Sequence, residues 1–172
     1  LDPKTGDRIV ELAAVRFKGR DNVSSFDSLV NPGRTVSPGA YNVNKISAEM
    51  LALAPVPGEV IPRFMDFIRG TCLCSYNASF DLGFLNNELR ILGLNGVSGI
   101  PVVDILKLAR RNIPGLESYA LWFVAKSLGI TGIQEHRALS DVLLTQKIFY
   151  ILKDIIAKRS GCPLSLENII DI

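Results

Sequence analysis

The sequence has little that would support membrane insertion, disulfide cross-linking or bulk attraction to nucleic acid. No uncharged apolar run reaches the ~18 residues that a membrane span needs, and Lys126 interrupts the best candidate, residues 121–130. Three cysteines without framework spacing indicate a reducing, cytoplasmic location, with Cys72 and Cys74 acting as small core residues. The formal net charge of +2 excludes histone-like binding through bulk positive charge.

Several catalytic motifs are also absent. The sequence contains no phosphate-cradling glycine-rich loop, no dinucleotide fingerprint and no zinc-binding pair. A nucleophilic Ser-His-Asp arrangement would need His136, the single histidine, but no serine stands in a Gly-x-Ser-x-Gly context. Carboxylates and one imidazole therefore remain as the main candidates for chemistry.

The remaining composition is that of an ordinary globular domain. The 172 residues are 48% hydrophobic and 21% charged, a size that suits one domain or slightly more. Apolar patterning predicts a hairpin from strands over residues 8–18 and 24–30, a loop with Pro38 and Gly39, and later strands over 71–76 and 101–105. Helices are predicted after Ser47, over residues 60–68, 82–92, 106–111 and 118–128, and over 138–158. This order predicts an α/β fold with a mixed sheet in one domain, residues 1–160, followed by a short tail, 161–172.

A first candidate site lies at residues 77–81, Asn-Ala-Ser-Phe-Asp, between a predicted strand and the next helix. The carboxyl end of a strand is the usual ligand site in α/β sheets, which makes Asp81 a candidate for chemistry. A helix cap is the alternative, because Ser79 or Asp81 can accept hydrogen bonds from the free N–H groups of the helix start.

A second candidate site lies at residues 136–141, His-Arg-Ala-Leu-Ser-Asp. Asp141 falls one turn into the last predicted helix and His136 lies just before it, so both can face one cleft. The alternative is that both residues have no catalytic role: His136 would be a surface histidine, and Asp141 an acid that the dipole at the helix start favours. Taken together, two carboxylates at two helix starts and one imidazole indicate metal-assisted hydrolysis, because divalent cations prefer carboxylate oxygens and imidazole suits a general base.

These two segments resemble motifs of a known family. Residues 77–85, Asn-Ala-Ser-Phe-Asp-Leu-Gly-Phe-Leu, are similar to the second motif of the DEDDh, or DnaQ-like, 3′–5′ exonucleases, and residues 136–141 match the third motif, His-x4-Asp. The further matching segments are residues 6–12, 29–32, 46–50, 104–110, 118–121 and 125–130. The resemblance thus covers nearly all of residues 1–158 in the family's order.

The resemblance implies a fold and a catalytic centre. Members have a ribonuclease-H-like fold and use two divalent cations, Mg²⁺ or Mn²⁺, that four acidic residues hold. On this basis Asp81 and Asp141 match the third and fourth acids, and His136 matches the general base that deprotonates the attacking water.

The resemblance also implies a substrate pocket. Val43, Asn44 and Phe80 align with positions that line the pocket of the 3′-terminal nucleotide, and Asn77 is assigned to the same substrate site. Asn44 and Lys45 stand where His-Gly or Thr-Gly is more common, so this pocket departs from the family's pattern.

The largest departure concerns the family's first motif, Asp-x-Glu-x-Thr-Gly, which supplies the first two acids. It would lie immediately before Leu1 and is not in the sequence. Its strand would lie between the strands predicted over residues 8–18 and 71–76. We therefore expect the natural protein to extend N-terminally, and a monomer that begins at Leu1 to lack catalysis and to self-associate through open strand edges.

The function implied by the resemblance is metal-dependent 3′–5′ exonuclease activity on single-stranded DNA ends, releasing nucleoside 5′-monophosphates, similar to the proofreading subunit of bacterial DNA polymerase III. Two alternatives stay open: a non-catalytic exonuclease-fold module that binds a polymerase or repair assembly, and a relative that trims RNA. Single strands of either sugar can stack on aromatic side chains, and no clear reader of the 2′-hydroxyl is visible. Polymerase subunits are the expected protein partners, and no membrane partner is expected.

Overall fold

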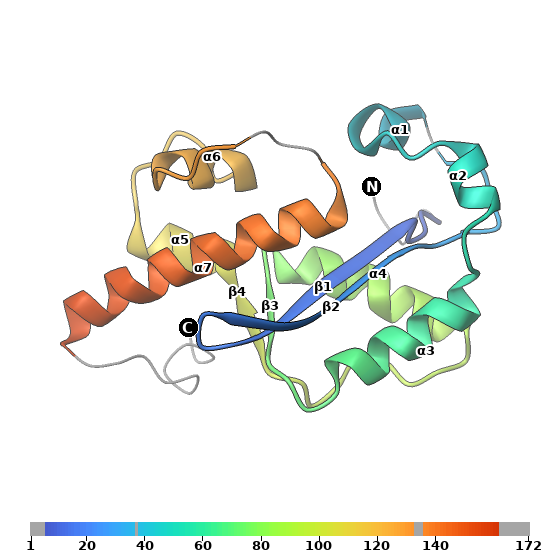
Figure 1. Cartoon of the computed structure of the whole chain (residues 1–172), viewed down its shortest axis with the longest axis horizontal. Coiled ribbons are helices and arrows are strands. Elements are labelled where there is room, and N and C mark those ends of the chain that lie inside the picture. The colour runs from blue at the N-terminus through green and yellow to red at the C-terminus, as the bar shows by residue number, and fades with distance from the viewer. Residues whose placement is uncertain (1–5, 37, 133–135, 162–172) are drawn as a thin grey trace.

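The computed structural model describes residues 6–36, 38–132 and 136–161. The chain opens with the predicted hairpin, in which β1 (Glu11–Lys18) pairs antiparallel with β2 (Asp21–Leu29) (Figure 1). Gly19, at φ +64°, and Arg20 form the turn. β2 begins three residues earlier than predicted because this turn needs two residues, whereas the sequence had suggested four.

Two short helices follow the hairpin, α1 (Pro38–Asn44) and α2 (Ala48–Ala52). The α2 helix begins as predicted, since the Ser47 hydroxyl accepts a hydrogen bond from the Met50 N–H at 3.3 Å. The loop prediction over α1 was wrong. Pro38 is the first residue of that helix. Proline is tolerated at this position because the N–H that it lacks would have no hydrogen-bond partner within the helix.

The remaining helices and strands follow in the order that the apolar pattern predicted. The elements are α3 (Pro57–Ile68), β3 (Leu73–Ser75), α4 (Ala78–Ile91), β4 (Val102–Asp104), α5 (Ile105–Asn112), α6 (Leu121–Ser127) and α7 (Ala138–Ser160). The helix predicted over residues 118–128 starts later than predicted: the Ser118 hydroxyl accepts from the Ala120 N–H at 3.2 Å, and α6 begins after Ala120. Among the described residues, no helix combines the length and the apolar character that crossing a bilayer requires.

The strands form two separate ladders, and the strand that was expected to lie between them is not among the described residues. β1 pairs with β2, and β3 pairs parallel with β4. A single sheet would need a strand that bonds to an edge of each ladder, and the described part of the chain supplies none. Each of the four strands therefore keeps one unpaired edge within the described residues.

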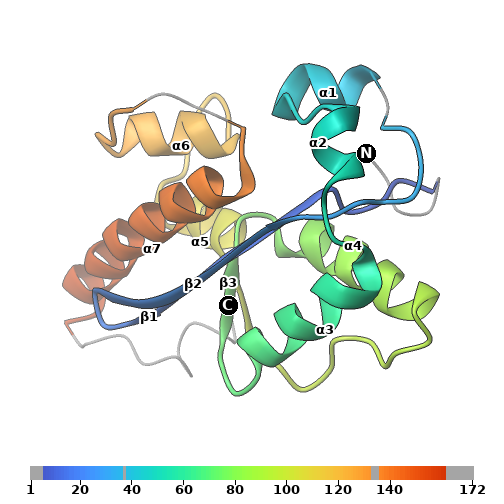
Figure 2. The ribbon, with the colours of Figure 1, turned by 45° about the vertical axis from the view of Figure 1, so that its right-hand side comes forward.

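The hairpin is packed between two groups of helices. Leu12 and Ala14 on β1 contact the core that α3 and α4 build, whereas Phe17 contacts the core around β4, α5, α6 and α7. Alternate residues of a strand point to opposite faces, so the two sides of β1 serve the two cores. Figures 1 and 2 show this arrangement, with α7 on one side of the hairpin and α3 on the other.

Candidate active site

Asp81 lies in the first turn of α4, directly after β3. The Ser75 hydroxyl, at the end of β3, donates a hydrogen bond to its carboxylate. The carboxylate remains open to solvent on one side, yet desolvation by the surrounding protein raises its pKa; the Ser75 hydrogen bond opposes this shift and the nearby charge of Asp104 adds to it. Asp81 is thus an accessible carboxylate whose negative charge is disfavoured by its surroundings.

Asp141 occupies the corresponding place in α7, again in the first turn. Desolvation raises its pKa, His136 lowers it and the charge of Glu11 raises it further. His136 is exposed and has a left-handed backbone, with φ +53°. The predicted pair of His136 and Asp141 is therefore brought together at the start of one helix.

Glu11 is a residue of this region that the sequence analysis missed. Its Oε1 accepts hydrogen bonds from Arg137 Nε at 2.8 Å and Nη2 at 2.6 Å, and its Oε2 accepts from the Ala138 N–H at 2.8 Å. The Glu11 side chain is 8% exposed, while that of Arg137 is 39% exposed. The one available signal was an acid inside an apolar strand segment, between Val10 and Leu12.

Asp104, the last residue of β4, is a second residue that was not singled out as a site residue. Its Oδ1 accepts from the N–H groups of Leu106 and Lys107 at 3.0 and 3.2 Å, which caps α5. Its Oδ2 accepts from the Ala78 N–H at 3.2 Å, the first residue of α4. The sequence signal for Asp104 was its place at the end of a predicted strand, the same signal that made Asp81 a candidate.

The predicted substrate residues lie on two elements. Val43 and Asn44 are at the end of α1, where Val43 is exposed and Asn44 Oδ1 accepts from the Ile46 N–H at 3.0 Å. Phe80 is 42% exposed in the first turn of α4, and its ring centroid lies 5.0 Å from that of Phe84. Asn77, just before α4, has a left-handed backbone with φ +66°.

Ser79 does not cap α4, although the sequence analysis gave this as the alternative to a catalytic role for residues 77–81. The N-cap residue is Asn77, whose side chain makes no capping hydrogen bond, and the Ser79 hydroxyl bonds to Asn77 Oδ1 at 3.2 Å. The first N–H of the helix is instead satisfied by Asp104. Asp81 therefore need not serve as a cap for Ala78, and its carboxylate is available for another role.

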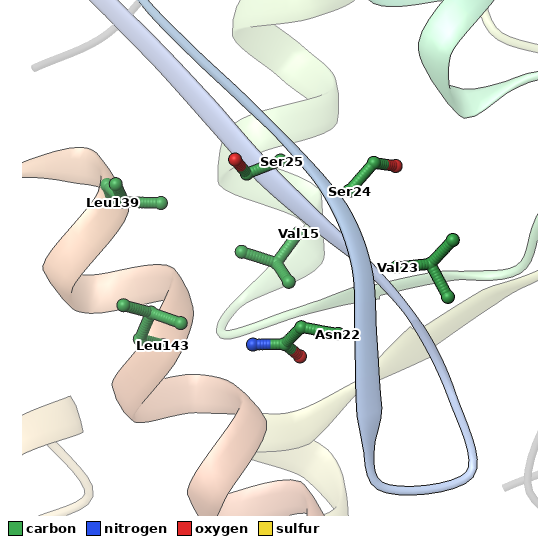
Figure 3. Close-up of a pocket in the computed structure, with 7 residues that line it drawn as sticks. All are labelled: Val15, Asn22, Val23, Ser24, Ser25, Leu139 and Leu143. Carbon is green, nitrogen blue, oxygen red and sulfur yellow. The ribbon is translucent and has the colours of Figure 1, made fainter.

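The views in Figures 1 and 2 agree on how these parts are arranged. Both α4 and α7 begin near the middle of the molecule, and α1 lies above these two helix starts. A separate cavity of about 290 Å³ lies between the hairpin and α7. Figure 3 shows Leu139 and Leu143 of α7 facing Val15 and Asn22 there, and none of the predicted site residues lines it.

Asp81 and Asp141 have the ligand chemistry that hard divalent cations prefer, but two carboxylates are too few to form a complete metal centre. Carboxylate oxygens are the ligands that Mg²⁺ and Mn²⁺ prefer, and Asp81 and Asp141 both have pKa values raised in the absence of a cation. Within residues 6–36, 38–132 and 136–161, however, no group of three or more His, Cys, Asp or Glu side chains could hold a metal ion. Two acids would thus form part of the ligand set.

Comparison with known proteins decides the family. A family model described as exonuclease matches residues 1–149. The chain belongs to this exonuclease family. The match includes both segments that carry Asp81 and Asp141, and the predicted resemblance to DEDDh exonucleases is confirmed.

Relatives of this exonuclease chain are DNA polymerase III proteins. The chain is 34% identical to the DNA polymerase III subunit epsilon of Treponema pallidum over 157 residues, 90% of this chain and 73% of that protein. It is 36% identical to the PolC-type DNA polymerase III of Bacillus cereus over 153 residues, 88% of this chain and 11% of that protein. The chain therefore spans about a tenth of the length of such PolC-type relatives.

Solved structures support the fold of the exonuclease chain. It superposes with a TM-score of 0.71 and 29% identity on exonuclease X in complex with 5′-overhanging duplex DNA, covering 94% of this chain and 89% of that one. The nuclease domain of 3′hExo, a DEDDh family member bound to rAMP, gives a TM-score of 0.74 at 17% identity, covering 92% and 84%. The fold is the ribonuclease-H-like α/β fold that the resemblance implied. Members of the DEDDh family use two divalent metal ions, which agrees with the expectation that catalysis in this family depends on metal.

Proposed function

We propose that this chain is the catalytic domain of a 3′–5′ exonuclease that removes nucleotides from single-stranded DNA ends and releases nucleoside 5′-monophosphates. The observation that carries this proposal is the placement of Asp81 and Asp141 in the first turns of two helices, with His136 beside Asp141. Membership of the exonuclease family supports the same reaction.

The side chains have distinct roles in this proposal. Asp81 and Asp141 hold divalent cations, Mg²⁺ or Mn²⁺, which when bound acidify the attacking water and stabilise the leaving 3′-oxygen. His136 accepts the proton of that water as the general base, and its exposed position leaves the imidazole accessible. Ser75 holds the Asp81 carboxylate in place through its hydroxyl.

A centre with four acids needs two carboxylates besides Asp81 and Asp141. We propose that a further strand supplies them and pairs with the open edges of β1 and β3. The existence of two separate ladders, each with unpaired edges among the described residues, supports this proposal. Residues 1–160 then form one exonuclease domain; the tail expected at residues 161–172 lies outside the described residues except for residue 161.

The 3′-terminal nucleotide would bind beside the start of α4. Phe80 offers an exposed aromatic face on which a base can stack, a contact that tolerates any sequence. Val43 adds exposed apolar surface from α1, and Asn44 and Asn77 provide amide groups. Stacking alone does not separate DNA from RNA, so an RNA 3′ end is the second candidate substrate.

The partners follow from the relatives. Two of them are named as DNA polymerase III proteins, which supports a polymerase as the protein partner, a role in proofreading and a cytoplasmic place of action. The exonuclease X structure with overhanging duplex DNA supports DNA as the nucleic acid. A non-catalytic module bound to a polymerase is the alternative from another functional class.

The test is a degradation assay with the whole protein that contains this chain. End-labelled single-stranded DNA and RNA are incubated with Mg²⁺ or Mn²⁺, and the products are separated by length. We expect shortening from the 3′ end with release of 5′-mononucleotides, and loss of that activity in Asp81→Asn and Asp141→Asn. Asp154→Asn is the matched control, because Asp154 is an exposed acid of the same helix as Asp141.

Two results would contradict the proposal. Full-length protein that binds single-stranded DNA but shortens neither DNA nor RNA with either metal would support the non-catalytic module. Activity that persists in Asp81→Asn and Asp141→Asn at the level of Asp154→Asn would show that these two acids do not carry the reaction.

A further inference from the structure

The helices that carry Asp81 and Asp141 begin in the same unusual way. A helix start is commonly capped by the side chain of its own N-cap residue. The N-cap residues of α4 and α7, Asn77 and Arg137, make no such hydrogen bond. In both helices a carboxylate from a strand accepts the first N–H instead: Asp104 for α4 and Glu11 for α7.

The spacing between cap and acid is also the same. Asp81 lies three residues after Ala78, and Asp141 lies three residues after Ala138. Residues three apart lie on one face of a helix, about one turn from each other. Each strand carboxylate therefore fixes the position of the helical turn from which the acid projects.

Glu11 holds its helix at more than one point. Besides the Ala138 N–H, it binds both Nε and Nη2 of Arg137, at 2.8 and 2.6 Å. All three donors belong to the start of α7, whereas Glu11 is the first residue of β1. The carboxylate is almost fully buried, so its oxygens depend on these donors and not on water.

Asp104 joins two helix starts through one carboxylate. Oδ1 takes the N–H groups at the start of α5, and Oδ2 takes the Ala78 N–H of α4 at 3.2 Å. Because Asp104 ends β4 and β4 pairs with β3, the strand pair and both helices share one fixed point.

We propose that Glu11 and Asp104 are positioning residues that aim Asp141 and Asp81 at the metal ions. This inference rests on the proposed function, in which those two acids hold the metals. Glu11 and Asp104 do not touch the metals; they act by fixing the first turns of α7 and α4.

The test uses Glu11→Gln and Asp104→Asn in the full-length protein. An amide has one acceptor oxygen and one donor NH₂ group, so Glu11→Gln would turn that NH₂ group toward either Arg137 or the Ala138 N–H. Asp104→Asn can keep the acceptor for α5 while an NH₂ group faces the Ala78 N–H. We expect kcat to fall at least ~10-fold in each variant, with KM within ~2-fold, because the lost contact misplaces a ligand and not the substrate.

A second measurement does not depend on turnover. In the metal-free protein, the Ala138 amide should exchange with solvent at least ~5-fold faster in Glu11→Gln, and the Ala78 amide at least ~5-fold faster in Asp104→Asn, as NMR would report. Calorimetric titration should show weaker Mn²⁺ binding in both variants. Glu59→Gln is the matched control, since Glu59 is an exposed acid in the first turn of α3, and it should change none of these values.

The outcomes separate this inference from the proposed function. Unchanged kcat, Mn²⁺ affinity and amide exchange in the two variants, while Asp81→Asn and Asp141→Asn are inactive, would overturn the positioning role alone. Activity in those two acid variants would overturn the proposed function itself. If Glu11→Gln does not fold, Arg137→Lys removes the two-point contact from the other side, and the same loss of kcat is expected from it.

Discussion

Arg8 and Glu88 form a two-point ion pair between the segment before β1 and the last turn of α4. Arg8 Nε and Nη2 each donate to a different Glu88 oxygen at 2.7 Å, and the Ile9 N–H donates to Oε1 at 3.2 Å. The Glu88 side chain is fully buried and that of Arg8 is 20% exposed. The hairpin is thus attached to α4 through a carboxylate that has no access to water.

The first prediction concerns this ion pair. Arg8→Ala should lower the free energy of unfolding by about 3 kcal/mol, because a buried carboxylate that loses its charged partner is costly. Chemical denaturation measures the change. Arg69→Ala is the control: it breaks the exposed pair with Asp66 and should cost less than about 1 kcal/mol. Equal effects of the two substitutions would contradict the importance of burial at Glu88.

The second prediction concerns the charges of Asp81 and Asp141 in the metal-free protein. Their pKa values are raised above the ordinary aspartate value of 3.8, so the folded state binds their protons more tightly than the unfolded state does. Asp81→Asn and Asp141→Asn should therefore raise the thermal midpoint at pH 7 when metal is absent. This advantage should shrink as the pH falls through the raised pKa values toward 3.8, because the wild-type carboxyls then become neutral.

Added Mn²⁺ should reverse that order at pH 7. The wild-type protein gains stability from the bound cation, whereas the two asparagine variants should gain much less. An equal rise in thermal midpoint for wild type and variants would show that neither acid binds the metal.

The third prediction concerns His136. His136→Ala should lower kcat by roughly 10²–10⁴-fold, the range typical for loss of a general base, while calorimetry shows Mn²⁺ binding largely retained. Lys147→Ala, on an exposed part of α7, is the control and should leave kcat unchanged. Turnover at the wild-type rate in His136→Ala would rule out its role as the base.

The fourth prediction concerns base stacking. Phe80→Ala should raise KM for single-stranded DNA about 10-fold with a smaller change in kcat, because base–aromatic stacking contributes about 1–3 kcal/mol per base. Ile91→Ala removes an exposed apolar side chain at the other end of α4 and should leave KM unaltered. The reverse pattern, with KM raised only in Ile91→Ala, would place the substrate elsewhere.

The fifth prediction concerns two half-buried thiols, that of Cys74 in β3 and that of Cys72 just before this strand. A hydrogen bond with the Cys74 thiol lowers the pKa of Cys72 to about 7, while the same contact and burial raise the pKa of Cys74. Alkylation of Cys72 by iodoacetamide should thus accelerate as the pH rises through about 7, with Cys74 unreactive, as peptide mass spectrometry would show. In Cys74→Ala the acceleration should move toward pH 9, and no move would disprove the contact.

Much of the fold could be predicted because the apolar patterns are strong and local. The stripes in α3, α4 and α7 and the alternation in β1 predicted elements that the structure contains. The helix α1 was missed because Pro38 and Gly39 also indicate a loop, and a seven-residue helix has too few apolar positions to show a period. The separation into two ladders agrees with the expectation that the strand of the first motif would lie between residues 8–18 and 71–76 and is not in the sequence.

The predicted site shows the same division. Asp81, His136 and Asp141 stood out because each lies in a short motif at a helix start. Glu11 did not, because its partners Arg137 and Ala138 are 126 and 127 residues away in sequence. A residue whose role is a distant contact leaves no local pattern, and the described structure is what reveals it.

The distance in sequence between Glu11 and Ala138 also has a consequence for folding kinetics. Contacts between residues so far apart close large loops, which slows folding and places such contacts late in it. During synthesis, α7 emerges after all the other helices and strands of the described chain, so the start of this helix can dock on Glu11 only when the domain is almost complete. In a partly synthesised chain Asp81 is therefore present before Asp141, and we expect nuclease activity to arise only as the last helix docks.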